Sequence, residues 1–310
     1  MKHAQLILGM IYLSFMTPLK SSDGEMEKFN TYINESISDA NIAGMAVAIV
    51  SGDSIVFTQG YGYSDIQTKE PFTPNTVINI ASISKTFVGV ALMHLVENGL
   101  INLDEDVNTF LPFKVLNPHL LESIITPRHL MSHSSGILDD QNVYLPSYHY
   151  GGDSPIPLGE FLADYLSQDG THYSKKNFTK SKPGEKFVYS NIGAGLAGYI
   201  VERVSGKPLN VFTRDVIFKP LGMNNTCWFL SEMDRSKHTR LYESEKKHTQ
   251  LKRVDLYGLT TYPDGGVRTT VTDLSYYLLC IMNKGVYKET RILNEETVID
   301  MLTPDYIDSY

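Results

Sequence analysis

The stretch Ile80-Ala81-Ser82-Ile83-Ser84-Lys85-Thr86-Phe87 opens a strongly predicted helix from Ser82 to Asn98, which has an apolar face and Gly99 as its stop. A serine three residues before a lysine lies on the same helix face, with the two Cβ atoms about 5–6 Å apart. Serine is a poor nucleophile without an adjacent base, and a lysine desolvated in a cleft can lose its proton and serve as that base. If the helix starts at Ser82, its hydroxyl also lies at the positive end of the helix dipole. The spacing therefore predicts a nucleophile and its base, although a helix cap followed by a solvated lysine has the same pattern.

A second candidate element is Tyr189-Ser190-Asn191, which follows the turn-forming segment 182–187. Residues two apart on an extended segment project to the same side, so Tyr189 and Asn191 are expected to point the same way. A phenol beside a lysine ammonium can relay a proton, and an asparagine amide can hold both the lysine and a substrate carbonyl. The structural alternative is a turn and a helix cap, in which Asn191 opens a helix to Val204 and Tyr189 only packs.

Outside these elements the sequence predicts one early hairpin and a long helical body. Two apolar runs, 44–50 and 54–61, are split by Gly52-Asp53, and both residue types tolerate the positive φ of a tight turn. Apolar residues at helical spacing predict a helix over 25–39 before this hairpin. Further helices are expected over 127–131, 158–166, 192–204, 209–216, 272–283 and 294–302. We expect the polar segment 142–181 to form loops around a cleft and 232–253 to be a charged connection.

Composition excludes several classes of protein. The 310 residues suggest about two domains at ~150 residues each, and 42% hydrophobic with 20% charged residues is typical of a folded chain. The net charge of −8 lacks the global basic footprint of a nucleic-acid-binding protein, so no nucleic-acid partner is predicted. Two cysteines exclude a disulfide scaffold and a cysteine-rich zinc site. A Cys227–Cys280 disulfide is permitted only if the chain leaves the cytoplasm.

The first 22 residues are predicted to be a signal peptide. A short basic start precedes the apolar run Leu6–Met16, which is shorter than the roughly 20 residues that a transmembrane helix needs. The alternative is a buried helix. We therefore expect an exported, periplasmic or extracellular protein whose mature chain, 23–310, has no membrane span.

Two histidines offer a competing metal site. His129 and His133 are four residues apart, as in a zinc-binding helix. In the H-E-x-x-H motif a glutamate follows the first histidine, but here Leu130 takes that place, and no third ligand is evident. We interpret both histidines as structural and predict no metal and no cofactor.

A lipase-type site is the other competing interpretation. Gly52-Asp53-Ser54 is similar to a lipase-type Gly-Asp-Ser start, and Asp169 to His172 supplies an Asp-x-x-His. That histidine should lie near the end of the chain, whereas His172 is near its middle. No Gly-x-Ser-x-Gly elbow occurs, so the hairpin turn explains Gly52-Asp53 better. Three tyrosines can line a substrate cleft or anchor half-buried loops, namely Tyr144, Tyr148 and Tyr150.

Together, the motifs resemble those of the serine β-lactamase and penicillin-binding-protein family. The likeness is strongest to its class C-like branch, which includes D-Ala-D-Ala carboxypeptidases and related esterases. Five segments match in order and span residues ~25–303, namely 80–87, 125–136, 183–193, 219–223 and 262–270. Five ordered matches are far more specific than any single motif.

This resemblance implies a β-lactamase/transpeptidase-like α/β fold, with an antiparallel sheet flanked by helices and a separate all-helical domain. The α/β part is expected over ~23–95 and ~255–310, the helical part over ~96–254, and the site in the cleft between them. The resemblance assigns Ser82 as acylated nucleophile, Lys85 as base, Tyr189 as proton relay and Asn191 as substrate ligand. The Ser82 N–H is expected to form half of the oxyanion hole. The implied function is an exported serine hydrolase that cleaves a small-molecule or peptide substrate: a D-alanyl peptide, a β-lactam or a small ester.

The chain departs from the family after Tyr189. The family has a third motif there, Lys-Thr-Gly or His-x-Gly, on a sheet strand, and no such triplet follows Tyr189. With only two clear strands we expect an incomplete sheet with a long unpaired edge. The alternative to an active hydrolase is a truncated, non-catalytic β-lactamase-like binding protein, a fragment, or a chain completed by another one. The sequence leaves the oligomeric state open.

Overall fold

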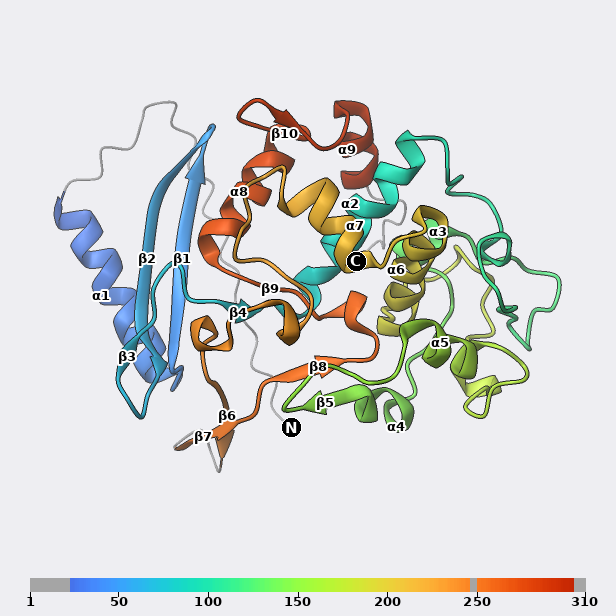
Figure 1. Ribbon diagram of the computed structural model, residues 1–310, viewed down its shortest axis with the longest axis horizontal. Helices are drawn as coiled ribbons and strands as arrows, with labels where there is room; N and C mark the ends of the chain where they lie inside the picture. The colour runs from blue at the N-terminus through green and yellow to red at the C-terminus, as the bar shows by residue number, and fades with distance from the viewer. Residues whose placement is uncertain (1–22, 246–249, 304–310) are drawn as a thin grey trace.

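The computed structural model describes residues 23–245 and 250–303 (Figure 1). A small antiparallel sheet lies at one end of the molecule, and the helical body fills the rest. The predicted signal peptide, residues 1–22, falls outside the described residues. Within those residues no helix is long and apolar enough to cross a bilayer.

The sheet has three strands in the order β1-β2-β3. The predicted hairpin is confirmed as β1 (Gly44–Ser51) and β2 (Ser54–Asp65), with Gly52 at a φ of +57° in the turn. The expectation of only two sheet strands was wrong, because β3 (Glu70–Pro71) pairs with the end of β2. A two-residue strand that contains proline has too little alternation to be recognised in the sequence.

Helices cover both faces of this sheet (Figure 1). Helix α1 (Asp23–Asp39) packs against β2, and α8 (Val271–Met282) packs on the other side against β1 and β2. The sheet is therefore the middle layer between the first helix and one of the last. Because α8 also borders the helical body, the hairpin is anchored to the remainder of the fold.

The core of the helical body is α2 (Ser84–Glu97), which packs against α6 (Asn191–Ser205). Phe87, Ala91 and Leu92 of α2 are fully buried, so the helix is enclosed rather than amphipathic. The surrounding helices are α3 (Pro127–Met131), α4 (Gln141–Tyr144), α5 (Leu158–Leu166), α7 (Leu209–Thr213) and α9 (Glu295–Leu302).

Four further pairs of short strands occur among the described residues. They are β4 (Ile78–Asn79) with β9 (Arg268–Thr269), β5 (Tyr148–Tyr150) with β8 (Tyr257–Leu259), β6 (Leu241–Glu245) with β7 (Gln250–Val254), and β10 (Val286–Tyr287) with β11 (Thr290–Arg291). Single 3₁₀ turns occur at 81–83 (η1), 107–109, 145–147, 175–177, 230–232, 235–237 and 262–264 (η8), and a π turn at 214–218.

Three local predictions need correction. The charged connection 232–253 contains most of the β6–β7 hairpin, in which few apolar side chains mark the strands. The polar segment 142–181 includes the strand β5, which was not predicted, besides loops and the helix predicted over 158–166, which is confirmed as α5. The helix expected over 209–216 is α-helical only to Thr213 and continues as the π turn.

The cysteines are both free, so the permitted disulfide does not form in this structure. Cys280 is buried in α8, and Cys227 is partly buried.

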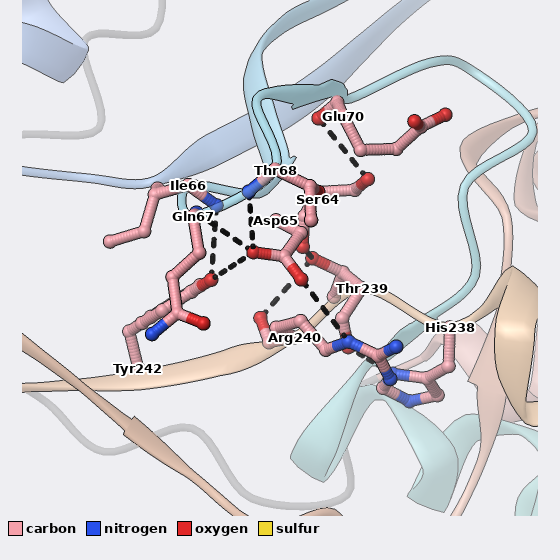
Figure 2. A network of polar contacts seen from close by, with 10 residues as sticks. All are labelled: Ser64, Asp65, Ile66, Gln67, Thr68, Glu70, His238, Thr239, Arg240 and Tyr242. Carbon is pink, nitrogen blue, oxygen red and sulfur yellow. Dashed lines mark hydrogen bonds and ion pairs between the residues drawn. The ribbon is translucent and has the colours of Figure 1, made fainter.

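A polar network centred on Asp65 ties the end of β2 to β6 and to the residue that precedes it (Figure 2). Its Oδ1 accepts hydrogen bonds from the Gln67 N–H (2.8 Å), the Thr68 N–H (3.4 Å) and the Tyr242 hydroxyl (3.3 Å). Its Oδ2 lies 3.5 Å from Arg240 Nε. The Gln67 N–H is the main cause that lowers the pKa of Asp65 below its ordinary value. The network therefore stabilises the carboxylate form.

Gly60 allows β2 to approach the segment after β3. A Cβ on this residue would lie 1.9 Å from the Phe72 carbonyl oxygen, which belongs to backbone and cannot move aside. We therefore expect Gly60→Ala to lower the free energy of unfolding by about 1–3 kcal/mol, measured by urea denaturation. Gly152→Ala is the matched control, since no atom lies within 4 Å of its Cβ position. Equal unfolding midpoints for the two variants would contradict the close approach.

The Asp65 network predicts a specific loss of stability in acid. A carboxyl whose pKa is lowered by folding contributes stability above its unfolded pKa of about 3.9, and that contribution disappears as the pH falls through the folded value. The melting temperature of Asp65→Asn should be below that of the unmodified protein at pH 7, and the gap should close toward pH 3. Asp53→Asn, at the exposed hairpin turn, is the control and should show no gap at either pH. A gap that stays constant with pH would argue against an ionised Asp65.

Candidate active site

The candidate nucleophile Ser82 lies in the 3₁₀ turn η1, two residues before α2 begins at Ser84. The α-helix therefore starts later than a dipole argument at Ser82 assumes. Ala81 has a φ of +46°, a left-handed conformation that a non-glycine residue keeps only where its surroundings impose it. The Ala81 N–H donates to Asn79 Oδ1 at 3.0 Å, and the Asn79 amide donates to the Gly265 carbonyl at 3.2 Å. This turn presents the Ser82 side chain to solvent.

Val267 fixes the turn on both sides of Ser82. The Ile80 N–H donates to the Val267 carbonyl at 3.0 Å, and the Val267 N–H donates to the Ser84 hydroxyl, also at 3.0 Å. Ser84 is fully buried, so its hydroxyl is committed to this bond. The segment before β9 thereby holds both ends of the nucleophile turn.

Lys85 lies in the first turn of α2 and uses all three donors of its ammonium group. Lys85 Nζ is 3.2 Å from Ser82 Oγ, 2.8 Å from Asn191 Oδ1 and 2.6 Å from the Asp264 carbonyl oxygen. The amine is therefore held between the nucleophile, the first residue of α6 and the end of η8.

Tyr189 completes the contacts to the nucleophile. Its hydroxyl donates to Ser82 Oγ at 2.8 Å, and the Lys85 ammonium lies 4.9 Å from the centre of its ring. The structure thus brings together the four residues predicted from sequence. Asn191 opens α6 as expected, and its side chain also faces Lys85, so the helix-cap alternative and the site interpretation hold together.

His133 supports Tyr189 from the other side. The two ring centres are 4.4 Å apart, and the Ser190 N–H donates to His133 Nδ1 at 3.3 Å. Burial, and then the charge of Lys85, lowers the pKa of His133 to about 4. The imidazole is therefore neutral near pH 7, as an acceptor of a backbone N–H must be.

The histidine pair does not form a zinc helix. His129 instead closes a capping box at the start of α3, where the Thr126 N–H donates to its Nδ1 at 3.2 Å. His133 lies beyond the end of α3, with a φ of +53°. Among the described residues there is no group of three or more histidine, cysteine or acidic side chains arranged to hold a metal ion.

The structure does not bring together the residues of the lipase-type alternative either. Asp53 and Ser54 lie at the β1–β2 turn, in the terminal sheet rather than in the helical body. His172 Nδ1 contacts the carboxyl group of Asp164 rather than that of Asp169.

Asp139 orients the start of α6 and was not identified from the sequence. Its two oxygens accept from the Asn191 N–H (2.8 Å), the Ile192 N–H (3.1 Å) and the Ser190 hydroxyl (2.8 Å). A carboxylate at a helix N-terminus is stabilised by the helix dipole. Asp139 follows the matched segment 125–136 by three residues. This proximity is the only signal in the sequence that could have indicated its role.

The tyrosine cluster lies beside the site as a row of side chains whose solvent exposure increases from Tyr144 to Tyr150. Tyr144 is buried and donates to Asp264 Oδ1 at 3.2 Å, Tyr148 is half-buried, and Tyr150 is exposed. Tyr148 and Tyr150 both contact the ring of Tyr257, whose hydroxyl donates to Asn79 Oδ1 at 3.2 Å. Only the outer members of the row face solvent.

A separate cavity of about 300 Å³ is lined by His133, Phe187, Met131 and other residues, but neither Ser82 nor Lys85 borders it.

Known proteins resemble this chain in sequence. The sequence model of the family described as Beta-lactamase matches residues 29–306. "Protein flp" of Staphylococcus aureus (strain MRSA252) is 27% identical over 265 residues, covering 84% of this chain and 50% of that protein. "Penicillin-binding protein 4*" of Bacillus subtilis (strain 168) is 28% identical over 193 residues, covering 62% of this chain and 39% of that protein. The chain spans about half the length, or less, of these curated relatives.

The fold agrees with a solved structure as well. The octameric penicillin-binding protein homologue from Pyrococcus abyssi has a TM-score of 0.78 at 30% identity, and the match covers 92% of this chain and 62% of that one. The expected β-lactamase/transpeptidase-like fold, helices around a small antiparallel sheet, is thereby confirmed. The family model matches nearly the whole chain, and the chain belongs to the beta-lactamase family.

Proposed function

We propose that this protein is an exported serine hydrolase that forms an acyl-enzyme with amide or ester carbonyls. The observation that carries the proposal is the convergence on Ser82 Oγ, which lies 2.8 Å from the Tyr189 hydroxyl and 3.2 Å from Lys85 Nζ. Both distances are within reach of proton transfer. The Ser82 side chain is exposed, so a carbonyl carbon can reach it.

Acylation begins with attack of Ser82 Oγ on the substrate carbonyl. Lys85, once neutral, takes the serine proton, and the backbone N–H of Ser82 donates to the developing oxyanion. The tetrahedral intermediate then loses its amine or alcohol. Tyr189 delivers the proton that this leaving group needs, because its hydroxyl already contacts Ser82 Oγ, and the proton that Lys85 took from Ser82 then replaces the one that Tyr189 gave. The net change is a serine ester plus the protonated leaving group.

Deacylation reverses the roles. A water molecule loses a proton to the Tyr189–Lys85 pair and attacks the acyl carbon, and Ser82 recovers its proton as the acid departs. Asn191 contributes to both halves as a substrate ligand. Because its Oδ1 is held by Lys85, its Nδ2 is the side-chain donor that remains for a substrate carbonyl.

The substrate class belongs to the same proposal. We propose a D-alanyl peptide, a β-lactam or a small ester, all of which offer a carbonyl that a serine can acylate. The names of the relatives that refer to penicillin binding support the first two. The exposed setting of Ser82 favours a small or flexible substrate over one that must be enclosed.

Export is proposed on the N-terminal sequence alone. The run Leu6–Met16 after a basic start is typical of a signal peptide, and D-alanyl peptides are substrates of the cell exterior. Cell fractionation of the tagged protein in its native host tests this step.

Removal of the nucleophile gives the first test of the mechanism. We expect Ser82→Ala to lower kcat/KM for p-nitrophenyl ester hydrolysis by at least about 10³-fold and to abolish labelling by a fluorescent fluorophosphonate. Ser54→Ala is the matched control because it removes the serine of the lipase-type alternative at the exposed hairpin turn. Ser54→Ala should retain full turnover and labelling. Labelling that survives in Ser82→Ala would refute the proposal, and an unlabelled, inactive native protein would favour a non-catalytic binding protein.

The proton-transfer roles give a second test. Lys85→Arg keeps the positive charge but cannot lose a proton, so we expect acylation to stop. Tyr189→Phe keeps the ring packed on His133 and removes only the hydroxyl, so kcat should fall by about 10²–10⁴-fold with little change in melting temperature. Steady-state ester kinetics and thermal unfolding of both variants provide the measurement. Full activity in either variant would remove that residue from the mechanism.

A further inference from the structure

One carboxylate, that of Asp139, holds the residue that connects Tyr189 to Asn191. Its Oδ1 accepts from the Ser190 hydroxyl at 2.8 Å, and its Oδ2 accepts from the Asn191 N–H at 2.8 Å. Ser190 is 1% exposed, and its hydroxyl oxygen also accepts from the Gly193 N–H at 2.9 Å. The proton of the Ser190 hydroxyl and one of its lone pairs are therefore both committed. Asp139 thus fixes the chain between the two site residues.

Asp139 is itself held in place by a buried tyrosine. The Tyr165 hydroxyl of α5 donates to the Leu138 carbonyl at 2.8 Å and accepts from the Asp140 N–H at 2.8 Å. This one hydroxyl therefore joins the residues on either side of Asp139. Tyr165 is fully buried, so breaking these bonds would leave buried polar groups unpaired, which is costly. The backbone of Asp139 consequently has a fixed position relative to the helical body.

The position of Ser190 determines where both site residues point. Tyr189 precedes it, and Asn191 follows it as the first residue of α6. The Tyr189 hydroxyl is 2.8 Å from Ser82 Oγ, and Asn191 Oδ1 is 2.8 Å from Lys85 Nζ. A group that transfers a proton must lie within about 2.6–3.2 Å of its partner. A small movement of Ser190 would therefore separate the Tyr189 hydroxyl from the nucleophile.

The other contacts of Tyr189 act on its ring. The ring centre of His133 is 4.4 Å from that of Tyr189, and Lys85 Nζ is 4.9 Å from the same centre. Contacts with the ring leave open the direction of the Cα–Cβ bond, which aims the hydroxyl. That direction depends on the backbone, and the backbone next to Tyr189 is held at Ser190.

We propose that Asp139 is a positioning residue that holds Ser190 and the start of α6, and so directs the Tyr189 hydroxyl toward the leaving group of the acylation step. This inference rests on the proposed acyl-enzyme function. Loss of Asp139 should impair proton delivery to the leaving group more than attack by Ser82, because Lys85 keeps its contact with the Asp264 carbonyl. An alkoxide leaving group needs that proton, whereas p-nitrophenolate departs without one.

The test compares two esters of the same acid. p-Nitrophenyl butyrate and ethyl butyrate give the same butyryl-enzyme, so they differ only in acylation. We expect Asp139→Ala to lower kcat/KM by about 10²-fold for the ethyl ester and by less than about tenfold for the p-nitrophenyl ester. Absorbance follows the p-nitrophenyl ester, and a pH-stat follows the ethyl ester. Asp139→Asn keeps one acceptor oxygen for the Ser190 hydroxyl and should show a smaller difference between the esters.

Asp140→Ala is the matched control. Asp140 is the neighbouring carboxylate, but it caps α4 instead of α6 and accepts from the Asn142 N–H at 3.0 Å. Its removal should change kcat/KM for the two esters by the same factor. A selective loss on the ethyl ester in Asp140→Ala would overturn the inference.

A double-variant cycle separates positioning from folding. In Tyr189→Phe the hydroxyl is absent, so adding Asp139→Ala should no longer change the ratio of the two kcat/KM values. A structural role of Asp139 would lower both values by the same factor in either background and would overturn the inference. Failure of both Asp139 variants to fold, as judged by circular dichroism, would overturn it as well.

The unmodified protein distinguishes this inference from the proposed function. Hydrolysis of the p-nitrophenyl ester alone would leave no proton delivery for Asp139 to direct, and would overturn only the inference. Absence of any Ser82 adduct, with neither ester hydrolysed, would overturn the proposed function and this inference with it.

Discussion

The hydrogen bonds of the Lys85 ammonium group are the interaction on which the site depends. One side chain joins the nucleophile turn, the start of α6 through Asn191, and the end of η8 through the Asp264 carbonyl. An ammonium group that is partly withdrawn from water must find such acceptors, because a lost hydrogen bond there costs about 1–3 kcal/mol or more. Three segments from different parts of the sequence therefore meet at one atom.

The packing of the helical body fixes the position of Lys85 Nζ. Helix α2 is enclosed on nearly every side. A rotation of the helix or a shift along its axis would therefore bury Lys85 or expose Phe87. Gly198 of α6 lets η8 approach, since a Cβ there would lie 2.5 Å from Pro263. The Asp264 carbonyl reaches Lys85 because this contact is close. The reactive geometry is thus a consequence of core packing as much as of the catalytic side chains themselves.

The sequence predicted the parts of the structure that local patterns encode. The β1–β2 hairpin and α2 follow from apolar periodicity with glycine and aspartate at the breaks. The pair Ser82 and Lys85 follows from its three-residue spacing, although Ser82 lies in η1, just before α2. Asp139 and Asp264 were missed because each acts on a segment remote in sequence, through contacts that only the fold creates. The strand pair β6–β7 was missed for a different reason. Charged residues are as numerous in its strands as apolar ones, and the apolar residues do not alternate along β6.

The acyl-enzyme at Ser82 is the central claim, and peptide mapping of the covalent adduct tests it most directly. The protein would be incubated with benzylpenicillin and separately with a small activated ester, quenched in acid, digested and analysed by mass spectrometry. We predict that the acyl group resides on the peptide that contains Ser82 and is lost again with time at neutral pH. An adduct on a different residue, or no adduct with either reagent, would contradict the claim.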